Sequence, residues 1–370
     1  MSFLDFVFYG FIVVVFIQVV YYLFFFSKFA FIKQKKERAK KIAVSVIICA
    51  KNEAENLQRF LPSIISQSYS DFEIVLINDA SSDDTLEVMK NFASNNENIK
   101  IVDVKNIEAF WGNKKYALTL GIKASKNDYL LFTDADCKPV SKYWIHDMCA
   151  HFNKENSIVL GYGAYSKVKK SFLNKLLRYE TLVTAVQYFS FAQAGIPYMG
   201  VGRNLAYARK EFFNANGFIN HIKIRSGDDD LFINQVATSS NTAICFSENS
   251  FTESIPKTSF NDWITQKRRH ISTAQHYKLN HKILLALFYC TQLFFWFFAM
   301  TLLITTFKWQ IVMALFLVRL IIQYTILGMS SKKLRESDLI ILLPVLEVFL
   351  IVVQLTIFIN NLISKPNHWK

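Results

Sequence analysis

The chain has 370 residues, of which 52% are hydrophobic, and a formal net charge of +13. Its mean hydropathy of +0.21 is too high for an ordinary soluble domain, and its length allows two or three structural units. A nucleic-acid-binding protein would carry a basic face on its folded domain. Here the positive charge lies beside apolar runs, at residues 28–41 (+6), 267–282 (+5) and 332–335 (+3). This arrangement indicates a membrane protein that follows the positive-inside rule.

Four apolar runs are long enough to span a bilayer: Phe6–Phe26, Ile283–Phe307, Trp309–Met329 and Leu339–Ile363. The first lacks a basic leader and a small-residue cleavage site, so we expect an anchor and not a removed signal. The basic cluster that follows it predicts that residues 33–282 are cytoplasmic. Four spans with both termini outside would then satisfy the charge rule.

Two charged residues interrupt these runs, Arg319 in the third and Glu347 in the fourth. They lie at similar depths, and a lone charge in lipid is costly, so we expect them to form an ion pair. A structural clamp between helices is the favoured role, and contact with a polar lipid head is the alternative.

The five cysteines show no metal-binding or redox spacing. They are Cys49, Cys137, Cys149, Cys245 and Cys290. We expect buried free thiols, which suit a reducing cytosol.

Between the first two apolar runs, short β-branched segments alternate with helical ones. The predicted strands are Val44–Ala50, Glu73–Asp79, Ile99–Val104 and Asp128–Asp134, and the predicted helices are Asn56–Ser66, Asp84–Phe92 and Asn113–Ala124. This alternation predicts a doubly wound α/β sheet, which binds ligands beyond the carboxyl ends of its strands. Neither G-x-G-x-x-G nor a P-loop lysine motif is present, which argues against the usual dinucleotide and Walker sites.

Acidic residues follow three of the predicted strands. The first strand runs into Asn52-Glu53, the second ends at Asp79, and the fourth ends in Asp134-Ala135-Asp136. Carboxylates that converge on one crevice repel each other and need a compensating cation. Asp134 and Asp136 can offer oxygen ligands to a divalent metal that also holds a diphosphate, and such hard ligands favour Mg²⁺ or Mn²⁺ over zinc.

Two further motifs lie nearer the second apolar run. Residues 228–230 are three consecutive aspartates, which suit either a catalytic base or a solvated helix N-terminus. Trp263 begins the segment that continues to Gln266, Arg269 and His270, and lipid-headgroup anchoring is its simplest explanation. The apolar segment Ser171–Gly195 is expected either along the membrane surface or in the core.

In this order and spacing, the motifs resemble those of membrane-integrated family 2 glycosyltransferases with a GT-A fold. That group includes cellulose, hyaluronan and chitin synthases and ceramide glucosyltransferases. The resemblance covers roughly residues 42–275 and the pattern D, D-x-D, D, Q-x-x-R-W, with His270 in the place of the tryptophan. It implies a nucleotide-diphospho-sugar transferase domain, a Rossmann-like mixed sheet, beside about four transmembrane helices. The expected divisions are a transmembrane helix at 1–27, a basic linker at 28–41, the transferase domain at 42–255, an interfacial segment at 256–282, and three transmembrane helices at 283–370.

The resemblance also implies roles for individual residues. Those expected around the donor nucleotide are Ala50, Asn52, Glu53, Asp79, Lys114 and Asp134. Asp136 is the expected direct metal ligand with Asp134 beside it, and Gly202-Arg203-Asn204 with Tyr207 resembles an acceptor-side loop. Asp229 matches the general base, with Asp228 and Asp230 as alternatives, and Gln266 and Arg269 are expected to assist the reaction.

The implied reaction moves a sugar, with inversion, from a nucleotide-diphosphate sugar to a lipid or lipid-linked acceptor at the cytoplasmic face of the inner or plasma membrane. A uridine donor is favoured over a guanosine donor. Processive polysaccharide synthesis is the first alternative, although His270 departs from the tryptophan expected there. A non-catalytic membrane protein that binds nucleotide-sugars is the second alternative, and no nucleic-acid partner is expected.

Overall fold

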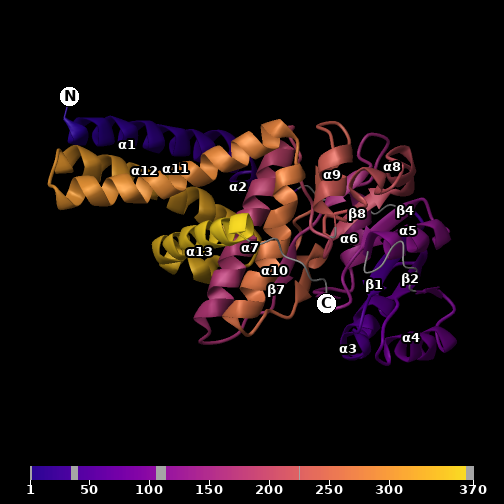
Figure 1. Cartoon of the computed structure of the whole chain (residues 1–370). Coiled ribbons are helices and arrows are strands. Elements are labelled where there is room, and N and C mark those ends of the chain that lie inside the picture. The colour runs from indigo at the N-terminus through magenta and orange to yellow at the C-terminus, as the bar shows by residue number, and fades with distance from the viewer. Residues whose placement is uncertain (1, 35–40, 106–113, 225, 364–370) are drawn as a thin grey trace.

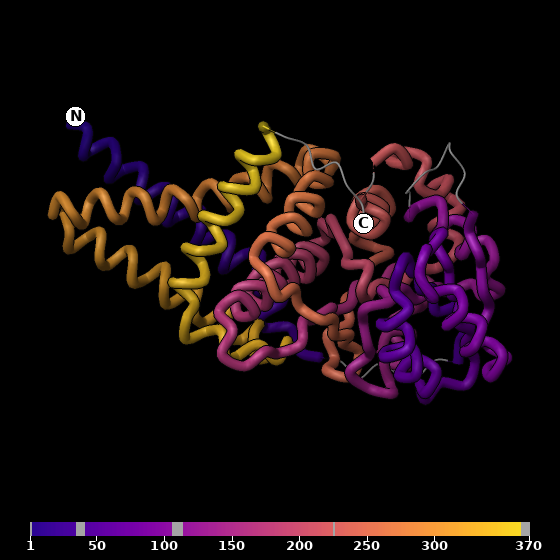
Figure 2. The backbone as a smooth tube through the Cα atoms, turned by 60° about the horizontal axis from the view of Figure 1, so that its bottom comes forward, coloured from indigo at the N-terminus to yellow at the C-terminus, as the bar shows by residue number. Residues whose placement is uncertain are grey.

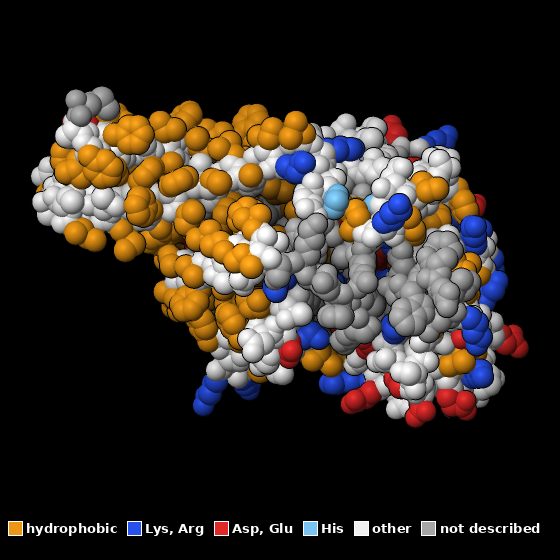
Figure 3. Space-filling view, viewed as in Figure 1, with side chains coloured by type: hydrophobic (Ala, Val, Ile, Leu, Met, Phe, Trp, Pro, Cys, Tyr) orange, Lys and Arg blue, Asp and Glu red, His pale blue; other side chains and the backbone are white. Residues whose placement is uncertain are grey.

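The computed structural model describes residues 2–34, 41–105, 114–224 and 226–363. A helical bundle of α1 (Phe3–Val20), α11 (Leu279–Ile304) and α12 (Trp309–Lys333) extends from one side of an α/β domain (Figure 1). Apolar side chains cover the visible surface of the bundle, whereas charged side chains gather over the domain (Figure 3). The surface therefore divides as the apolar runs and the α/β pattern predict.

A seven-stranded mixed sheet forms the centre of the domain, in the order β3-β2-β1-β4-β8-β6-β9. β1 pairs in parallel with β2 and β4, and β2 pairs in parallel with β3. These four strands lie where strands are predicted. Successive residues of β1, β2 and β4 are buried, as is typical of a parallel sheet, whereas β3 at the edge is only partly buried. Their bounds are Val44–Ala50 (β1), Phe72–Asp79 (β2), Ile99–Val104 (β3) and Tyr129–Phe132 (β4).

The later strands depart from the parallel pattern. β8 (Leu205–Ala208) runs antiparallel to both β4 and β6 (Ile158–Leu160), and β6 is parallel to β9 (Thr242–Ile244). A separate three-stranded sheet has the order β5-β10-β7. Its strands are Cys137–Pro139 (β5), Thr252–Ser254 (β10) and Gly163–Tyr165 (β7). It holds the chain directly after the D-x-D motif.

The predicted helices of the domain form on the expected segments. α3 buries Leu57, Leu61 and Ile64 at helical spacing, which explains its amphipathic sequence. The domain helices are α3 (Ala54–Ile65), α4 (Thr85–Ser94), α5 (Lys114–Ala124), α6 (Trp144–Ala150), α8 (Arg209–Asn214) and α9 (Asp230–Val236). Residue 113, predicted to begin α5, lies outside the described residues, as does most of the basic stretch 35–41.

Two longer helices join the domain to the bundle. α7 (Phe172–Gln193) begins at Ser171, whose hydroxyl accepts a hydrogen bond from the Asn174 amide, and most of its side chains are buried. Of the two expected environments for this segment, core packing is therefore the one observed. α10 (Phe260–Thr273) begins at Ser259 in the same way and buries Trp263.

All four predicted apolar runs are helices long and apolar enough to cross a membrane. In the first, α1 continues through a π-helical turn at Tyr21–Phe26 (η1) into α2 (Ser27–Ala30). Arg319 and Glu347 are both buried and form an ion pair at 2.5 Å, and Gln18 of α1 accepts a further hydrogen bond from Arg319 at 2.6 Å. This contact confirms the predicted ion pair and supports its role as a clamp between helices.

The last helix, α13 (Leu343–Ile363), crosses α11 and contacts it at two points. Near its start, Glu347 accepts a hydrogen bond from Gln292, and one turn later the Ile351 carbonyl accepts one from the Tyr289 hydroxyl, each at 3.1 Å. Gln292 lies about 20 Å and Tyr289 about 15 Å along α11 from the end nearest the domain. α13 thus approaches the domain as it proceeds, and it runs across the direction of α11 and α12 (Figure 2).

Both ends of the segment 336–361 contact helices attached to the domain. At its start, Arg178 of α7 forms ion pairs with Glu336 and Asp338. At its end, the Asn361 side chain accepts a hydrogen bond from Arg268 of α10 at 3.0 Å. The path of α13 therefore differs from that of α1, α11 and α12, whose far ends lie away from the domain (Figure 1).

The cysteines are all free, as predicted, but their burial varies. Cys137, Cys149 and Cys245 are buried, Cys49 is half-buried, and Cys290 is exposed on α11. The prediction of buried thiols is thus wrong for Cys290. Its position on the outer surface of a candidate membrane helix places a small apolar side chain where lipid would surround it.

Candidate active site

A cavity of about 630 Å³ lies where the acidic strand ends face α7, α10 and α13. It contains most of the residues that the sequence singles out: Glu53, Asp79, Lys114, Asp134, Asp136, Asp228, Asp229, Asp230, Gln266, Arg269 and His270. The parallel strands β1, β2 and β4 deliver their carboxyl ends to one edge of the sheet, which explains the convergence.

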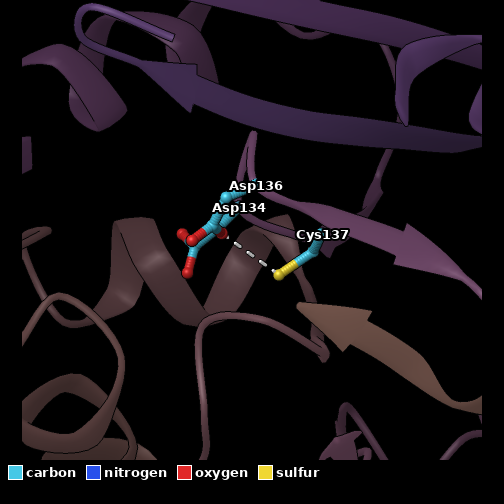
Figure 4. Close-up of side chains that lie close together, drawn as sticks. All are labelled: Asp134, Asp136 and Cys137. Atoms are coloured by element: carbon cyan, nitrogen blue, oxygen red, sulfur yellow. Dashed lines mark hydrogen bonds between the residues drawn. The ribbon is translucent and has the colours of Figure 1, made fainter. Parts of the chain in front are cut away.

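Asp134 and Asp136 lie close together beside Cys137 at the start of β5 (Figure 4). One ligand atom from each of the three residues lies within 4.8 Å of the others, and the Cys137 thiol donates a hydrogen bond to Asp136 at 3.3 Å. Burial, and then the nearby Asp134, raise the pKa of Asp136. Two hard carboxylates held this close suit a Mg²⁺ or Mn²⁺ ion, so the donor set fits the predicted metal.

Lys114, at the start of α5, connects two of the acidic motifs. Its ammonium group lies 3.1 Å from Asp134 and 3.1 Å from Asp228. Burial alone would lower the pKa of Lys114, but the two aspartates hold it well above its usual value. Lys114 is therefore a fixed positive charge in the cavity, beside the predicted metal ligand.

The neighbouring Lys115 was not singled out from the sequence, yet it is fully buried. Its ammonium group donates hydrogen bonds to the carbonyls of His221, Ile224 and Ser226, at 2.8, 2.7 and 2.7 Å. These bonds hold the loop that leads into the three aspartates. Only its position next to Lys114 could have indicated this role.

The three consecutive aspartates have different partners. Asp228 pairs with Lys114, which outweighs burial and lowers the pKa of Asp228. Asp230 accepts hydrogen bonds from the hydroxyls of Thr273 and Tyr277, so it is held by α10 and the turn after it. All three line the cavity, and among the described residues Asp229 is the one of them with neither an ion pair nor a hydrogen bond from a side chain.

Asp229 accepts its hydrogen bonds from backbone N–H groups within the part of the chain that the structure describes. They are those of Gly202, at 2.6 Å, and Asp230, at 2.7 Å. Burial, followed by repulsion from Asp228 and Asp230, raises the pKa of Asp229 to about 7. A carboxyl group with this pKa is suited to exchange protons near neutral pH.

The Q-x-x-R segment lies on α10 and faces the same cavity. Gln266, Arg269 and His270 all line it. Burial, followed by the nearby cations Lys267 and Arg269, lowers the pKa of His270 well below its usual value, so its imidazole is neutral. The buried Gln266 Oε1 has no hydrogen-bond partner among the described residues.

The predicted acceptor-side loop divides into two parts. Gly202 and Arg203 line the cavity, and Arg203 stacks on Tyr165 at 4.5 Å while donating a hydrogen bond to Ser254 at 2.6 Å. Asn204 instead bonds to Tyr162, Ser250 and Trp144 in the core, and Tyr207 stacks on Phe132 of the sheet. The sequence motif therefore contains both cavity residues and supports for the fold.

The predicted nucleotide residues also differ in position. Asp79 and Glu53 line the cavity, and burial raises the pKa of Asp79. Ala50 is buried at the end of β1. Asn52 has φ of 56° and accepts a hydrogen bond from the Ser82 amide at 2.8 Å, which joins the loops after β1 and β2. Neither Ala50 nor Asn52 is among the described cavity-lining residues, whereas Lys51 is.

Residues 45–223 match the family model described as glycosyl transferase family 2. The chain contains a family 2 glycosyltransferase domain. Its D-x-D motif, strands β2, β3, β4, β6 and β8 of the mixed sheet, and helices α5 and α7 lie within the matched residues, whereas the three aspartates and β9 follow them.

Individual relatives match over shorter segments. The chain is 37% identical over 102 residues to a poly-β-1,6-N-acetyl-D-glucosamine synthase of Staphylococcus epidermidis, covering 28% of this chain and 24% of the relative. It is 34% identical over 96 residues to a cholesterol galactosyltransferase of Borreliella burgdorferi, covering 26% of this chain and 25% of the relative. These matches span about a quarter of the length of each relative.

One solved structure resembles nearly the whole chain. A mannosyltransferase of Pyrobaculum calidifontis, in complex with GDP-mannose and Mn²⁺, has a TM-score of 0.59 and 15% sequence identity. The superposition covers 93% of this chain and 99% of that one. It supports the GT-A fold of the domain together with the adjoining helices.

Proposed function

We propose that this protein transfers a sugar, with inversion, from a nucleoside-diphosphate sugar to a hydroxyl group of a lipid or lipid-linked acceptor at the membrane. The observation that carries the proposal is Asp229. It faces the same cavity as Asp134 and Asp136, and its pKa of about 7 suits a general base.

The donor side of the cavity is formed by the ends of β1, β2 and β4. Asp79 would bind the base or ribose, and Glu53 and Lys51 line the same cavity. A uridine donor follows from the family resemblance. A guanosine donor belongs in the same test panel, because the similar mannosyltransferase was solved with GDP-mannose.

Asp136, with Asp134 beside it, would hold a Mg²⁺ or Mn²⁺ ion, and the Mn²⁺ in the similar mannosyltransferase complex supports this assignment. When bound, such an ion neutralises the negative charge that develops on a leaving diphosphate. Lys114 adds a fixed positive charge next to Asp134, and Arg269 on α10 adds another where it lines the cavity. Gln266, whose buried oxygen has no partner among the described residues, is placed to orient a hydroxyl donor.

In the proposed reaction, the acceptor oxygen bonds to the anomeric carbon while the bond from that carbon to the diphosphate oxygen breaks. Asp229 takes the hydroxyl proton, and the electron pair of the broken bond leaves with the nucleoside diphosphate. Attack from the face opposite the leaving group inverts the anomeric configuration. The Gly202 amide holds Asp229 at 2.6 Å, which fixes the direction of its carboxylate.

The charge distribution supports a cytoplasmic domain. The domain-facing ends of the helices carry Lys33, Lys282, Lys332 and Lys333, whereas Lys308 is at the far end of the bundle. The positive-inside rule then places the domain in the cytoplasm and Lys308 outside. Because α13 returns toward the domain, we favour three crossings with a re-entrant α13 over the four crossings expected from the sequence. The C-terminus would then be cytoplasmic.

Processive polysaccharide synthesis is the second candidate, and the match to a polysaccharide synthase favours it. His270 stands where that reaction's tryptophan is expected. Product length separates the two functions, since a single transfer adds one sugar to each acceptor.

Substitution Asp229→Asn tests the proposed base. We expect transfer to fall by about 10²–10⁴, because the amide accepts no proton, while donor binding is retained. The matched control is Asp84→Asn, which alters an exposed carboxylate before α4, outside the cavity. Transfer by Asp229→Asn at nearly the wild-type rate would exclude Asp229 as the base, and loss of donor binding would show that it holds the nucleotide instead.

A further inference from the structure

One wall of the cavity is built by helices that adjoin or enter the membrane. We call this the helical wall. It comprises the lining residues that come from α7, α11 and α13: Glu180, Thr181, Thr184, Gln187, Tyr188, Leu285, Leu350, Val353, Gln354 and Ile357. A site that bound only a nucleotide-sugar and a water-soluble acceptor would have no need of Leu285, Val353 and Ile357. The same cavity therefore joins the acidic strand ends to an apolar surface.

Polar side chains are interspersed in the helical wall, and three of them have no observed partner. Within the described residues, no hydrogen bond involves the side chains of Thr184, Gln187 or Gln354. Gln354 lies on α13, between the cavity-lining Val353 and the exposed apolar Phe358. An amide placed among apolar residues near lipid is costly unless it finds a partner. These three groups are suited to bind hydroxyl or carbonyl oxygens of a ligand.

The charge of the helical wall further restricts this ligand. Among its described residues, Glu180 is the one charged side chain, and it is paired with Lys267 of α10 at 2.5 Å. A phosphate group placed here would find no cation among the described residues of α7, α11 and α13 that line the cavity. The wall is therefore complementary to an uncharged head group that carries hydroxyls.

The path of α13 explains how such a molecule reaches the cavity. The opposite face of α13 exposes Val345, Phe349, Val352, Ile359 and Leu362, which form one apolar stripe at helical spacing. One face of the same helix would thus contact lipid, while the other lines the cavity. Leu285 of α11 lines the same cavity as this face of α13. The two helices cross steeply (Figure 2).

We propose that the helical wall binds a membrane lipid acceptor with an uncharged, hydroxyl-bearing head, which enters from the bilayer beside α13. Its hydrocarbon part packs on Leu285, Leu350, Val353 and Ile357, and its head contacts Gln354, Gln187 and Thr184 on the way to Asp229. This inference rests on the proposed function, since it names the acceptor class for the same site. The hydroxyl proton passes to Asp229 as its oxygen replaces the nucleoside diphosphate on the anomeric carbon.

A photoactivatable, click-tagged diacylglycerol tests the proposal without relying on transfer. The full chain is reconstituted in phosphatidylcholine nanodiscs with the probe, irradiated, and mapped by peptide mass spectrometry. We expect labelling on the segments that contain Leu285 and residues 350–357. Val353→Trp fills the wall and should reduce this labelling by about tenfold or more. Val352→Trp is the matched control, because Val352 is 55% exposed on the opposite face, and it should leave the labelling unchanged.

Gln354→Leu provides a second variant that preserves side-chain size. It should weaken labelling by the diacylglycerol, because the head loses a hydrogen-bond partner. A phosphatidate with the same acyl chains should not compete with the probe. Equal competition by phosphatidate would overturn the uncharged head, and labelling that is the same in wild type, Val353→Trp and Gln354→Leu would overturn the site.

Nucleotide-sugar binding, measured on the same samples, separates this proposal from the proposed function. Retained donor binding in Val353→Trp shows that the domain is folded and that the substitution acts on the lipid. If the wild type binds no nucleotide-sugar, the proposed function fails, whereas the lipid labelling is judged on its own. If the wild type transfers sugar but the helical wall is not labelled, only the present inference fails.

Discussion

The pH dependence of sugar transfer is a sharp test of Asp229 as the base. Burial, followed by repulsion from Asp228 and Asp230, raises its pKa to about 7. An aspartate in water has a pKa of about 3.9. The base must be deprotonated to accept the acceptor proton, so transfer should fall as the pH is lowered through about 7 and reach a plateau above it.

The magnitude of this fall distinguishes Asp229 from an ordinary carboxylate. At pH 5, a group with a pKa near 7 is deprotonated in about 1% of molecules, whereas an ordinary aspartate is more than about 90% deprotonated. We therefore expect kcat/KM at pH 5 to be roughly 100-fold below its plateau value. An unperturbed base would give a nearly constant rate over the same range.

Initial rates are measured from pH 5 to pH 8.5 with excess metal, and donor binding is measured at each pH. Donor binding that stays constant assigns the fall in rate to the chemical step. Asp230→Asn removes one like charge and should move the acid limb to lower pH, whereas Asp84→Asn should not move it. A rate that is constant between pH 5 and pH 8 would refute the assignment of Asp229.

Two further predictions concern the metal and the membrane topology. Chelation with EDTA should abolish transfer, and Mn²⁺ or Mg²⁺ should restore it. Without the ion, Asp134 and Asp136 would repel the donor diphosphate. Full activity in the chelator would exclude the metal role. A reporter fused after residue 370 should be active on the cytoplasmic side, because α13 returns to the domain. A reporter fused before residue 1 should be active on the outer side, because α1 would cross the membrane once before the cytoplasmic domain. A tail reporter found outside would restore the four-span topology.

Local sequence pattern predicted the first half of the domain well. Strands β1 to β3 are short runs rich in β-branched residues, and β4 is a short apolar run. Their carboxyl ends meet because the pairing is parallel. The antiparallel β8 and the small second sheet were not predicted. The strands of the second sheet have three residues each, too few to show a pattern, and the pairing of β8 and of this sheet depends on contacts made across long sequence separations.

The sequence could not choose among the three consecutive aspartates by residue type. The choice depends on tertiary partners, since Lys114 neutralises Asp228 and Thr273 holds Asp230. Likewise, hydropathy predicted that residues 339–363 are long and apolar enough to span a membrane, but hydropathy carries no information on whether the helix leads away from the domain or back to it. The direction follows from contacts such as that between Tyr289 and Ile351.

The contacts of α10 connect the proposed base to the proposed lipid wall. The Thr273 hydroxyl on α10 donates to Asp230, which directly follows Asp229, and Arg268 on the same helix donates to Asn361 at the end of α13. A displacement of α13 would therefore strain the helix that holds the base loop. An acceptor seated against α13 is positioned relative to Asp229 by these two contacts. The donor would be held at the opposite side of the cavity, by the ends of β1, β2 and β4. The distance between the acceptor hydroxyl and the anomeric carbon therefore depends on how α10 packs between the domain and the membrane helices.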